Sequence, residues 1–499
     1  MTNFIPSKEE FIKLTKKGNL IPVYKEISAD LETPVSAFMK IDRGNHSFLF
    51  ESVEGGEKIA RYSFLGAEPS LIFKSKGNRI EITENGKSSE FTTPLDPLFE
   101  MKKVLERYKF VPIEGLPRFC GGLVGYMGYD MINFFEELPT KNPDDLELPD
   151  AVFLLTDTIL IFDHVNHSIK VVSNAYIKDS PSSAYREATK RIDNSIKLLS
   201  RPIRKEARRS RKASRAKSSI ISNFTENGFV EAVKKAKHYV KIGDIIQIVL
   251  SQRFKTGFNY APIDLYRRLR MVNPSPYMYY LKLNDMALVG SSPELMVRCE
   301  DGIVELRPIA GTRPRGKTEE EDKKLERNLL ASPKEKAEHI MLVDLGRNDI
   351  GRVCKYGTVK VSELMVIERY SHVMHIVSEC VGKLRKDKDQ FDVVRATFPA
   401  GTVTGAPKIR AMEIIEELEN VKRGPYAGLV GYFSFSGNVD TCINIRTILV
   451  KDKKAYIQAG AGIVADSNPD KEYQETINKA RGMIKAIELV GGTFPKVPG

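Results

Sequence analysis

The sequence has no tryptophan, few cysteines and no long hydrophobic run. Its five cysteines are scattered, odd in number and without the spacing of metal ligands or of a disulfide framework, which indicates reduced thiols. No apolar run approaches the about 18 residues that span a bilayer. The start, "MTNFIPSKEEFIKLTKK", lacks the apolar segment of a signal peptide. These absences argue against disulfide-rich and membrane-spanning classes and predict a cytoplasmic protein.

Positive charge is concentrated in one short segment. The net charge is +12, but residues 201–219 contain nine Lys or Arg and one Glu, which leaves +4 on the other 480 residues. This segment is polar and has no apolar periodicity, which predicts a flexible linker. It also lacks interleaved aromatics, so an RNA- or membrane-binding role is the weaker alternative. We therefore expect an N-terminal α/β region over 1–200, a basic flexible linker over 201–222 and a C-terminal region over 223–495.

Short patterns indicate both helices and strands. In residues 1–200, alternating polar and apolar stretches predict strands, and "DPLFEMKKVLERYKF" has the 3.6-residue periodicity of a helix. Residues 121–130, "GGLVGYMGYD", are echoed by 427–436, "AGLVGYFSFS". The echo marks either two equivalent strands or chance, because glycine and aromatic residues recur in many twisted sheets.

Residues 307–316, "RPIAGTRPRG", hold three arginines, two prolines and two glycines. Prolines lack an N–H donor and fix φ, so this stretch is neither a regular helix nor a central strand. Because guanidinium groups are always charged and grip carboxylates or phosphates, we expect an anion nearby. Ala310 stands in the middle of the stretch with an inert side chain.

Two predicted helices, over 332–345 and 468–489, each begin with a capping residue followed by proline. Each carries two glutamates three positions apart, which places the pair on one face. Such acids also serve as helix caps, lie on solvated faces or pair at i,i+4, as Glu475 can with Lys479, so each pair alone is weak evidence. Together the two pairs can hold Mg²⁺, although spacing leaves open whether the helices meet. The four glutamates are Glu335, Glu338, Glu472 and Glu475.

Other polar groups lie in glycine-rich or buried-looking contexts. The stretch 398–415, "FPAGTVTGAPKIRAMEII", runs from a Gly/Thr loop into a helix start, where N–H groups favour anions. Its spacing is not that of a P-loop, nor is that of 121–128 a dinucleotide fingerprint. The loop "AGAGIV" at 459–464 would let backbone approach a ligand. Arg446 lies in a buried-looking strand and needs an anionic or strongly polar partner, whereas His375, in an apolar context, is more often structural.

Seven motifs follow one another in the C-terminal region: "PIAGTRPRG", "EHIMLVDLGRND", "VMHIVSE", "FPAGTVTGAPKIRAM", "GPYAGLVGYF", "AGAGIVADS" and "EYQET". In this order they resemble the chorismate-utilising enzymes, most closely the large, chorismate-binding subunits (component I) of anthranilate synthases. The motifs cover nearly all of residues 224–489, and "FESVEGGEKIARYSFLG" and "GGLVGYMGYD" extend the match to the N-terminal half. The basic segment matches nothing in the family.

The resemblance implies a fold and a reaction. The implied fold is α+β, with two large, mainly antiparallel β-sheets packed as a sandwich and flanked by helices, to which both halves of the chain contribute. The implied reaction is the Mg²⁺-dependent conversion of chorismate and ammonia to anthranilate and pyruvate, the first committed step of tryptophan biosynthesis. The anion expected near the three arginines would then be chorismate, a ring with two carboxylates.

The resemblance also implies roles for individual residues. Hydroxide is a poor leaving group, so an acid must protonate the departing C4 hydroxyl, and by resemblance this acid is Glu294 in "SSPELMVR". Mg²⁺ would anchor the ring carboxylate on the opposite side. The implied metal ligands are Glu338 and Glu475 directly, with Glu335 and Glu472 acting through waters. The implied substrate contacts are Tyr426, Arg446 and the backbone at Gly460 and Gly462 for the enolpyruvyl carboxylate, with Thr402 and His375 along the ring.

Two positions distinguish the reactions of the family. Relatives that add water carry a lysine base where this chain has Gln247, and aminodeoxychorismate synthases carry a lysine nucleophile where it has Ala310. Ammonia already offers a lone pair, so both residues favour its direct attack on C2, with His375 assisting pyruvate elimination. No amidotransferase nucleophile elbow surrounds any cysteine, so a separate glutamine amidotransferase subunit (component II) is the expected partner. The alternatives are an aminodeoxychorismate synthase component I of the folate pathway that has lost its lysine, and a non-catalytic binding protein that uses its basic segment.

Feedback inhibition by tryptophan is a further expectation. "FESVEGG" at 50–56 and "NPSPYMYYL" at 273–281 resemble the family's tryptophan-binding elements, although the second also reads as a turn and a buried strand. A ligand between them would pin together two parts of the chain on opposite sides of the linker. The implied inhibitor-binding residues are Glu51, Ser52, Pro276, Tyr277 and Met278, with Val430 and Tyr432 completing the wall.

Overall fold

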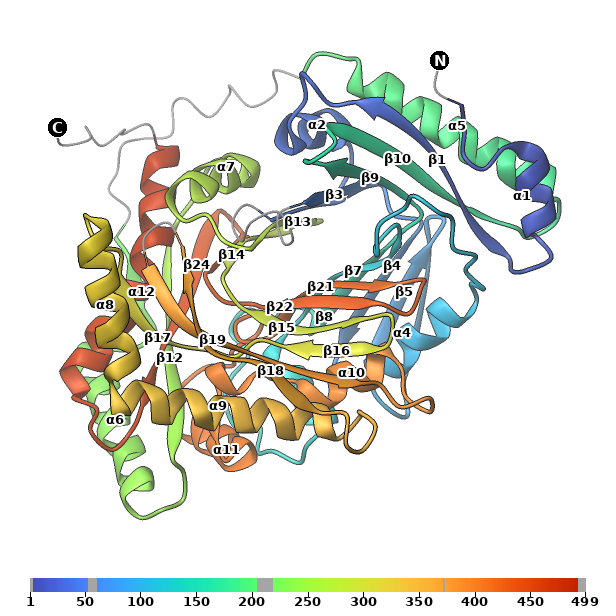
Figure 1. Cartoon of the computed structure of the whole chain (residues 1–499). Coiled ribbons are helices and arrows are strands. Elements are labelled where there is room, and N and C mark those ends of the chain that lie inside the picture. Colours follow the sequence, from blue (N-terminus) through green and yellow to red (C-terminus); the bar gives the residue numbers. More distant parts are fainter. Residues whose placement is uncertain (1–2, 53–60, 204–218, 371–372, 492–499) are drawn as a thin grey trace.

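Two large antiparallel sheets pack face to face in the computed structural model, which describes residues 3–52, 61–203, 219–370 and 373–491 (Figure 1). Each sheet has 12 strands, and helices flank both sheets. The predicted α+β sandwich is therefore confirmed. Most of the predicted basic linker, 204–218, lies outside the described residues.

The first sheet takes strands from both halves of the chain, and all its pairs are antiparallel. Its order is β1 (Leu20–Ser28), β10 (Ser168–Tyr176), β9 (Thr158–Asp163), β3 (Tyr62–Ala67), β2 (His46–Glu51), β13 (Tyr277–Leu283), β14 (Met286–Ser292), β23 (Thr447–Lys451), β24 (Lys454–Ile463), β12 (Gln247–Gly257) and β11 (Ile221–Ser222), with β20 (Gly405–Ala406) beside β12.

The second sheet is built in the same way. Its order is β17 (Ile309–Pro314), β19 (Val373–Lys383), β16 (Ile303–Leu306), β15 (Leu295–Glu300), β22 (Val439–Ile443), β21 (Leu429–Ser434), β7 (Gly122–Met127), β8 (Ala151–Thr156), β4 (Leu71–Lys76), β5 (Arg79–Glu84) and β6 (Lys87–Thr92), with β18 (Lys360–Arg369) beside β19. The proline-containing stretch 309–314 is thus an end strand, where missing N–H donors are tolerated.

Helices cover the outer faces, and their starts follow the capping signals of the sequence. Ser332 caps α9 and Asn468 caps α12, each followed by proline. No helix in the described ranges is long and apolar enough to cross a membrane. The helices are α1 (Lys8–Leu14), α2 (Pro34–Ile41), α4 (Pro97–Glu106), α5 (Pro181–Leu199), α6 (Glu226–Lys241), α7 (Pro262–Val272), α8 (Glu319–Ala331), α9 (Pro333–Gly351), α10 (Gln390–Thr397), α11 (Lys408–Leu418) and α12 (Pro469–Val490), with 3₁₀ helices η1 (Tyr129–Phe134) and η3 (Gly401–Val403).

The echo between 121–130 and 427–436 has a structural counterpart. The two segments form β7 and β21, which pair so that Gly125 lies opposite Gly431. Outward from this pair the second sheet continues as β8, β4 and β5 on one side and as β22, β15 and β16 on the other, so that the two series correspond strand by strand. In the first sheet, the strands on the two sides of the β2–β13 pair correspond in the same way. The two halves of the chain therefore repeat one strand topology, and strands from both sides of 201–222 share each sheet. The division at 200 and 222 stays a prediction.

Candidate active site

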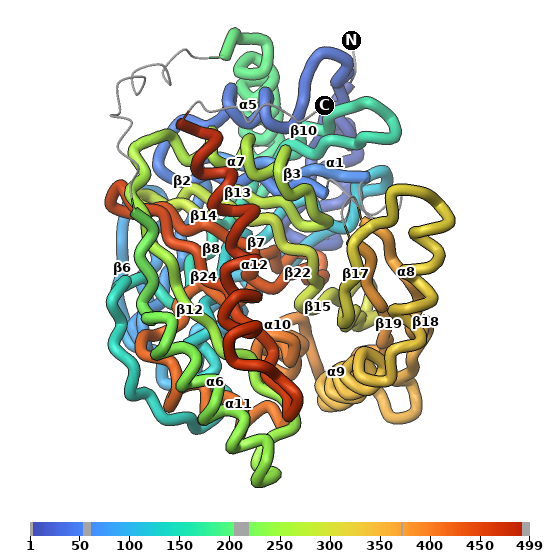
Figure 2. The backbone as a smooth tube through the Cα atoms, turned by 90° about the vertical axis from the view of Figure 1, so that its left-hand side faces the viewer, coloured from blue at the N-terminus to red at the C-terminus, as the bar shows by residue number. Residues whose placement is uncertain are grey.

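A cavity of about 630 Å³ is lined by residues of α9, of α12 and of strands from both sheets. Figure 2 shows the backbone of these elements. The cavity walls come from β12, β17 and β24, from the start of α9 and α12, and from the η3 turn. All residues predicted for catalysis and for substrate, nucleophile and metal binding line this one cavity. They are Gln247, Glu294, Ala310, Glu335, Glu338, His375, Thr402, Tyr426, Arg446, Gly460, Gly462, Glu472 and Glu475.

Glu294 sits in the turn between β14 and β15, with 8% of its surface exposed. Burial raises the pKa of its carboxyl to about 8, although the nearby Thr402 hydroxyl and Lys479 act in the opposite direction. No hydrogen bond joins Glu294 to Thr402, whose buried hydroxyl has no partner among the described residues. Glu294 is therefore protonated at neutral pH, as a general acid must be.

The two carboxylates of α9 face the cavity with protein partners. Glu335 pairs with Arg313 at 3.1 Å, and Glu338 Oε1 accepts a hydrogen bond from Gln247 Nε2 at 3.1 Å. Burial raises the pKa of Glu338, and the neighbouring Glu335 adds to the effect. A carboxylate whose charge is disfavoured in this way gains from a nearby cation.

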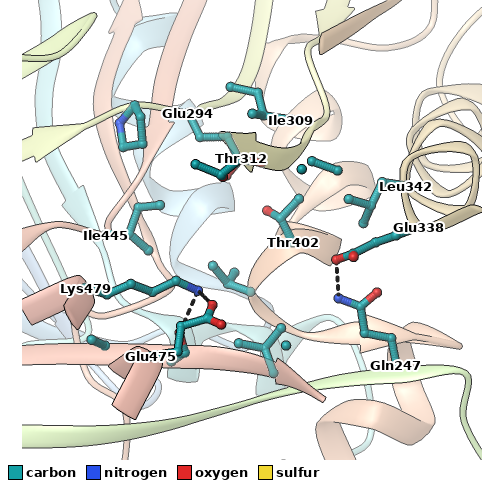
Figure 3. Close-up of a pocket in the computed structure, with 18 of the residues that line it drawn as sticks. Gln247, Glu294, Ile309, Thr312, Glu338, Leu342, Thr402, Ile445, Glu475 and Lys479 are labelled. Atoms are coloured by element: carbon teal, nitrogen blue, oxygen red, sulfur yellow. Dashed lines mark hydrogen bonds and ion pairs between the residues drawn. The ribbon is translucent and has the colours of Figure 1, made fainter. Parts of the chain in front are cut away.

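The two carboxylates of α12 lie across the cavity from those of α9. Figure 3 shows Glu475 and its partner Lys479 on one side and Glu338 with Gln247 on the other. The Glu475–Lys479 distance is 2.8 Å, so the i,i+4 pair that the sequence allowed is formed. Glu472 Oε2 is buried without a hydrogen-bond partner among the described residues, and burial raises the pKa of Glu472.

These four carboxylates are the donors that a hard divalent cation would use. Within the described ranges, no three metal-ligating side chains converge on one point. Instead, Arg313, Gln247 and Lys479 hold three of the four carboxylates, and an oxygen of Glu472 is left over. Mg²⁺ binds through one or two carboxylates and retains several waters, so oxygen donors on two facing helices fit it.

Arg446 is a buried cation that lines the same cavity, beside α12. Its backbone has a φ of 52°, and its Nη1 donates to the Lys479 carbonyl oxygen at 2.9 Å. Burial lowers the pKa of the guanidinium, and no ion pair joins it to a carboxylate in the described part of the chain. A Cβ on Gly460 would lie 2.7 Å from the Tyr426 hydroxyl, so glycine is needed for this close approach. Arg446, Tyr426 and the β24 backbone thus form a polar pocket suited to a carboxylate.

The residues proposed for the nucleophile side lie on different strands: Gln247 on β12, Ala310 on β17 and His375 on β19. Gln247 is 4% exposed, and its Oε1 is buried without a partner among the described residues. Ala310 precedes an irregularity in the β17–β19 pairing, at which Gly311 has a φ of 65°. His375 Nδ1 lies 2.9 Å from the Gly311 carbonyl oxygen. Because a carbonyl oxygen only accepts hydrogen bonds, Nδ1 is protonated and donates to it. Burial lowers the pKa of the ring. The imidazole is therefore neutral, with Nε2 free to accept a proton.

One expectation from the sequence is wrong. The three arginines of "RPIAGTRPRG" do not line the cavity but hold carboxylates of the protein. Each arginine, in β17 or within two residues of it, forms an ion pair with a different neighbouring element, because a buried or half-buried guanidinium pairs with the nearest carboxylate. The pairs are Arg307 with Glu368 on β18, Arg313 with Glu335 on α9 and Arg315 with Asp322 on α8.

Sequence reasoning missed several cavity residues. The sequence indicates Lys479 only as a partner of Glu475. In the structure its Nζ also donates to the Gly460 carbonyl oxygen at 2.9 Å. Lys334, Gln458 and Asn478 also line the cavity. Spacing along α9 and α12 could have indicated Lys334 and Asn478, since each lies within one turn of a predicted metal ligand.

A second, smaller cavity of about 70 Å³ collects the residues predicted to bind tryptophan. It forms because β2 pairs with β13, which places Glu51 opposite Met278. The Glu51 carboxylate accepts a hydrogen bond from Tyr266 and pairs with Arg270 at 3.2 Å, while the buried Ser52 hydroxyl has no partner among the described residues. The predicted lining residues are Glu51, Ser52, Pro276, Tyr277, Met278, Val430 and Tyr432.

Comparisons with known proteins agree with this arrangement. The model of the chorismate binding enzyme family matches residues 45–485. Anthranilate synthase component 1 of Acetivibrio thermocellus is 50% identical over 98% of this chain and 99% of its own length, and that of Aquifex aeolicus is 51% identical over 97% and 98%.

Solved structures repeat the fold. Anthranilate synthase component I from Streptococcus pneumoniae has a TM-score of 0.73 and 37% identity, over 92% of this chain and 98% of its own. The menaquinone-specific isochorismate synthase MenF of Escherichia coli has a TM-score of 0.69 at 17% identity, over 96% and 98%, and supports the fold alone.

Proposed function

Because this chain belongs to the chorismate binding enzyme family, we propose that it acts as the chorismate-using component of an anthranilate synthase. It converts chorismate and ammonia to anthranilate and pyruvate, at the start of tryptophan biosynthesis. The observation that carries the proposal is that one cavity joins a buried acid with a raised pKa, Glu294, to a buried arginine, Arg446, that forms no ion pair within the described part of the chain. An anionic substrate with a poor leaving group needs both.

The enolpyruvyl carboxylate of chorismate binds at the Arg446 end. The guanidinium gains an anionic partner there, and the Tyr426 hydroxyl and the backbone at Gly460 and Gly462 supply further polar contacts. This end fixes the ring so that its C4 hydroxyl faces Glu294, with Thr402 and His375 along the ring.

Mg²⁺ would be held by Glu338 and Glu475 directly and by Glu335 and Glu472 through waters. When bound, the ion anchors the ring carboxylate and withdraws electrons from the ring. To bind it, Glu338 and Glu475 exchange Gln247 and Lys479 for the cation. The unpartnered oxygen of Glu472 and the raised pKa of Glu338 support this donor set, because both groups gain from a nearby positive charge.

Glu294 and ammonia carry out the substitution. The Glu294 proton passes to the departing C4 oxygen, the C4–O bond breaks and water leaves. The ammonia lone pair forms the new C2–N bond as the ring double bonds shift towards C4, and the added nitrogen then gives up one proton to the Glu294 carboxylate. In the following elimination, the C2 proton passes to neutral His375 Nε2, the C3–O bond breaks with its electron pair going to the enolpyruvate oxygen, and the ring becomes aromatic. The His375 proton then adds to the methylene carbon of enolpyruvate, which gives pyruvate.

Gln247 and Ala310 fit ammonia as the nucleophile. Gln247 Oε1 is buried without a hydrogen-bond partner among the described residues, so it can accept a hydrogen bond from an N–H of ammonia. The ammonia lone pair stays free for attack. Ala310 offers no covalent nucleophile. The ammonia is supplied by a partner glutamine amidotransferase, component II, since no cysteine of this chain lies in an amidotransferase motif.

Tryptophan inhibits the enzyme from the second cavity. An amino acid there would meet the unpartnered Ser52 hydroxyl and the buried carboxylate of Glu51, with the indole against Pro276 and Met278. Because the cavity is formed by β2 and β13, a bound ligand couples the two halves of the chain.

The test is product formation by the purified chain with chorismate, Mg²⁺ and an ammonium salt at alkaline pH, followed by anthranilate fluorescence and chromatography. We expect anthranilate with ammonium and none with glutamine until an amidotransferase subunit is added. Aminodeoxychorismate as product would favour the folate-pathway alternative, and no chorismate consumption would refute the enzyme assignment. Glutamine use by the chain alone would refute the need for a partner.

A further inference from the structure

A buried ion pair lies directly behind one wall of the cavity. Arg423, after α11, donates from Nε to Glu419 Oε2 at 3.0 Å and from Nη2 to Glu419 Oε1 at 2.6 Å. Arg423 is 2% exposed and Glu419 is 5% exposed. Removing both charges from water is costly, and an apolar pair of similar volume is often as stable. Stability alone therefore does not explain why the pair is present.

The Arg423 guanidinium contacts three parts of the cavity wall. Nη1 donates to the Val403 carbonyl oxygen at 2.8 Å and Nη2 to the Val249 carbonyl oxygen at 2.7 Å. The guanidinium carbon lies 5.6 Å from the centre of the Tyr426 ring. Val403, Val249 and Tyr426 all line the cavity, and Val403 follows Thr402. One planar group thus joins the η3 turn, strand β12 and the tyrosine proposed to bind substrate.

The partner carboxylate extends this connection to a fourth part. Glu419 Oε1 accepts hydrogen bonds from the Ser251 N–H at 2.8 Å and from its hydroxyl at 2.9 Å. Ser251 Oγ in turn accepts from Gln458 Nε2 at 2.8 Å, and Gln458 lines the cavity on β24. The Arg423–Glu419 pair is therefore hydrogen-bonded to β12 and, through Ser251, to β24, and both strands line the cavity.

The N-terminal half supports Arg423 from behind. The guanidinium carbon lies 4.7 Å from the centre of the Tyr129 ring, and Tyr129 is itself buried. The Tyr129 N–H donates to the Gly424 carbonyl oxygen at 2.7 Å, and the Gly424 N–H donates to Asp130 Oδ2 at 2.9 Å. The last two residues of "GGLVGYMGYD", which have no place in the proposed chemistry, thus hold the turn that carries Arg423.

We propose that Arg423 is a positioning residue that fixes Tyr426 and the backbone beside Thr402 in the geometry required for substrate binding. The inference rests on the proposed function, in which Tyr426 and Thr402 meet chorismate. Arginine suits this role because its planar fork directs several N–H groups at once, whereas a lysine ammonium provides one flexible centre. Tyr129 and Asp130 make the first half of the chain part of the same device.

The test compares Arg423→Lys with Arg253→Lys. Arg253, on β12, is buried like Arg423. It donates to Asp145 and to the Lys422 carbonyl oxygen, and neither residue lines the cavity. We expect Arg423→Lys to raise the KM for chorismate and to lower kcat/KM by about tenfold or more, the effect of losing one or two charge-assisted hydrogen bonds. Arg253→Lys should leave KM unchanged. An unchanged KM in Arg423→Lys overturns the proposal.

A double-variant cycle asks whether Arg423 acts through Tyr426. If it does, Arg423→Lys costs clearly less in kcat/KM when Tyr426→Phe is already present than in the wild type. Independent, multiplicative losses would refute the connection. Should Arg423→Lys fail to fold, the paired change Arg423→Gln with Glu419→Gln removes both buried charges together and serves in its place.

Hydrogen exchange gives a readout that needs no turnover. In Arg423→Lys, peptides covering 401–405 and 424–428 should exchange faster than in the wild type, and in Arg253→Lys they should not. Equal exchange in these peptides overturns the positioning role whatever the activity. A wild type that consumes no chorismate would instead refute the proposed function, so the two failures are distinguishable.

Discussion

Replacing Glu294 with glutamine should stabilise the folded chain while it abolishes chorismate turnover. The carboxyl is 8% exposed, and burial raises its pKa from 4.5 to about 8. Between these two values the folded state keeps a proton that the unfolded chain has lost, so folding stability falls as the pH rises through this window. The isosteric amide is neutral at every pH and is free of that penalty.

The magnitude follows from the width of the window. Each pKa unit corresponds to about 1.4 kcal/mol. Glu294→Gln should therefore raise the free energy of unfolding by about 3 kcal/mol at pH 7 and by only about 1 kcal/mol at pH 5. Below pH 4.5 the gain vanishes, and above pH 8 it is constant.

Because the chain has no tryptophan, urea unfolding is best followed by circular dichroism, at several values between pH 5 and pH 8. Glu9→Gln, at an exposed position on α1, controls for the substitution itself. A gain that does not change with pH would refute the raised pKa, and a variant less stable than wild type at pH 8 would refute the burial argument. In the wild type, kcat/KM for chorismate, at a fixed concentration of free ammonia, should decline above about pH 8 as the acid is lost.

Four further changes test other parts of the molecule. Glu338→Gln should lower activity by more than about 100-fold and weaken Mg²⁺ binding in calorimetry; near-normal turnover at low Mg²⁺ would contradict the ligand assignment. Ser52→Phe should fill the second cavity and weaken tryptophan inhibition by about tenfold or more with catalysis largely intact, and a wild type indifferent to millimolar tryptophan would remove the basis for this site. In the wild type, Lys408 Nζ lies 2.7 Å from Asp349 Oδ2, so Lys408→Met leaves the buried carboxylate unpaired. This change should lower the free energy of unfolding, measured in urea, by about 3–5 kcal/mol, and adding Asp349→Asn should recover most of that loss. A loss below about 1 kcal/mol would show that the pair does not stabilise the fold. Replacing 203–217 with a neutral Gly/Ser sequence should leave turnover unchanged, because the cavity is lined by residues between 247 and 479, and a large loss would assign the basic segment a function.

The sequence predicted much of the fold because its strongest signals are local. Ser332 and Asn468 with their following prolines mark the starts of α9 and α12, and the structure places the helices there. The pairing of the strands is not local. Nothing in the periodicity of β2 or β13 indicates that they lie side by side, since their partners are more than 200 residues apart in the chain. Only the resemblance to a known family supplied the sandwich.

The arginine stretch shows where residue types alone mislead. A guanidinium requires an anion, but its chemistry does not distinguish a substrate carboxylate from a glutamate of the same chain. Arg313 binds Glu335, whereas Arg446, in the bend between β22 and β23 and not in the strand that the sequence indicated, has no ion pair with a carboxylate among the described residues. Burial without an ion pair is the property for which we propose Arg446 as the substrate-facing cation, and it can be observed only in the tertiary structure.

The repeat of strand topology shows which described segments of the second half are added to the pattern of the first. After β16 the second half inserts β17, α8, α9 and β18 before β19 takes the place that β6 has in the first half. After α10 it inserts η3, β20 and α11 before β21. These insertions carry Ala310, Glu335, Glu338, Thr402 and Tyr426, together with the Arg423–Glu419 pair.

The first half has no corresponding segments, and the remaining cavity residues come from strands and helices that both halves possess. Strands β12 and β24 and helix α12 correspond in order to β1, β10 and α5. The repeated strand topology therefore supplies a frame, to which inserted segments of the second half add part of the candidate site, whereas Glu294, His375 and Glu475 lie on elements that both halves possess. The corner formed by Tyr129 and Asp130 of the first half contacts Arg423 and Gly424, at the end of an inserted segment. On this reasoning, the motif "GGLVGYMGYD" serves the active site without contributing any group to the chemistry.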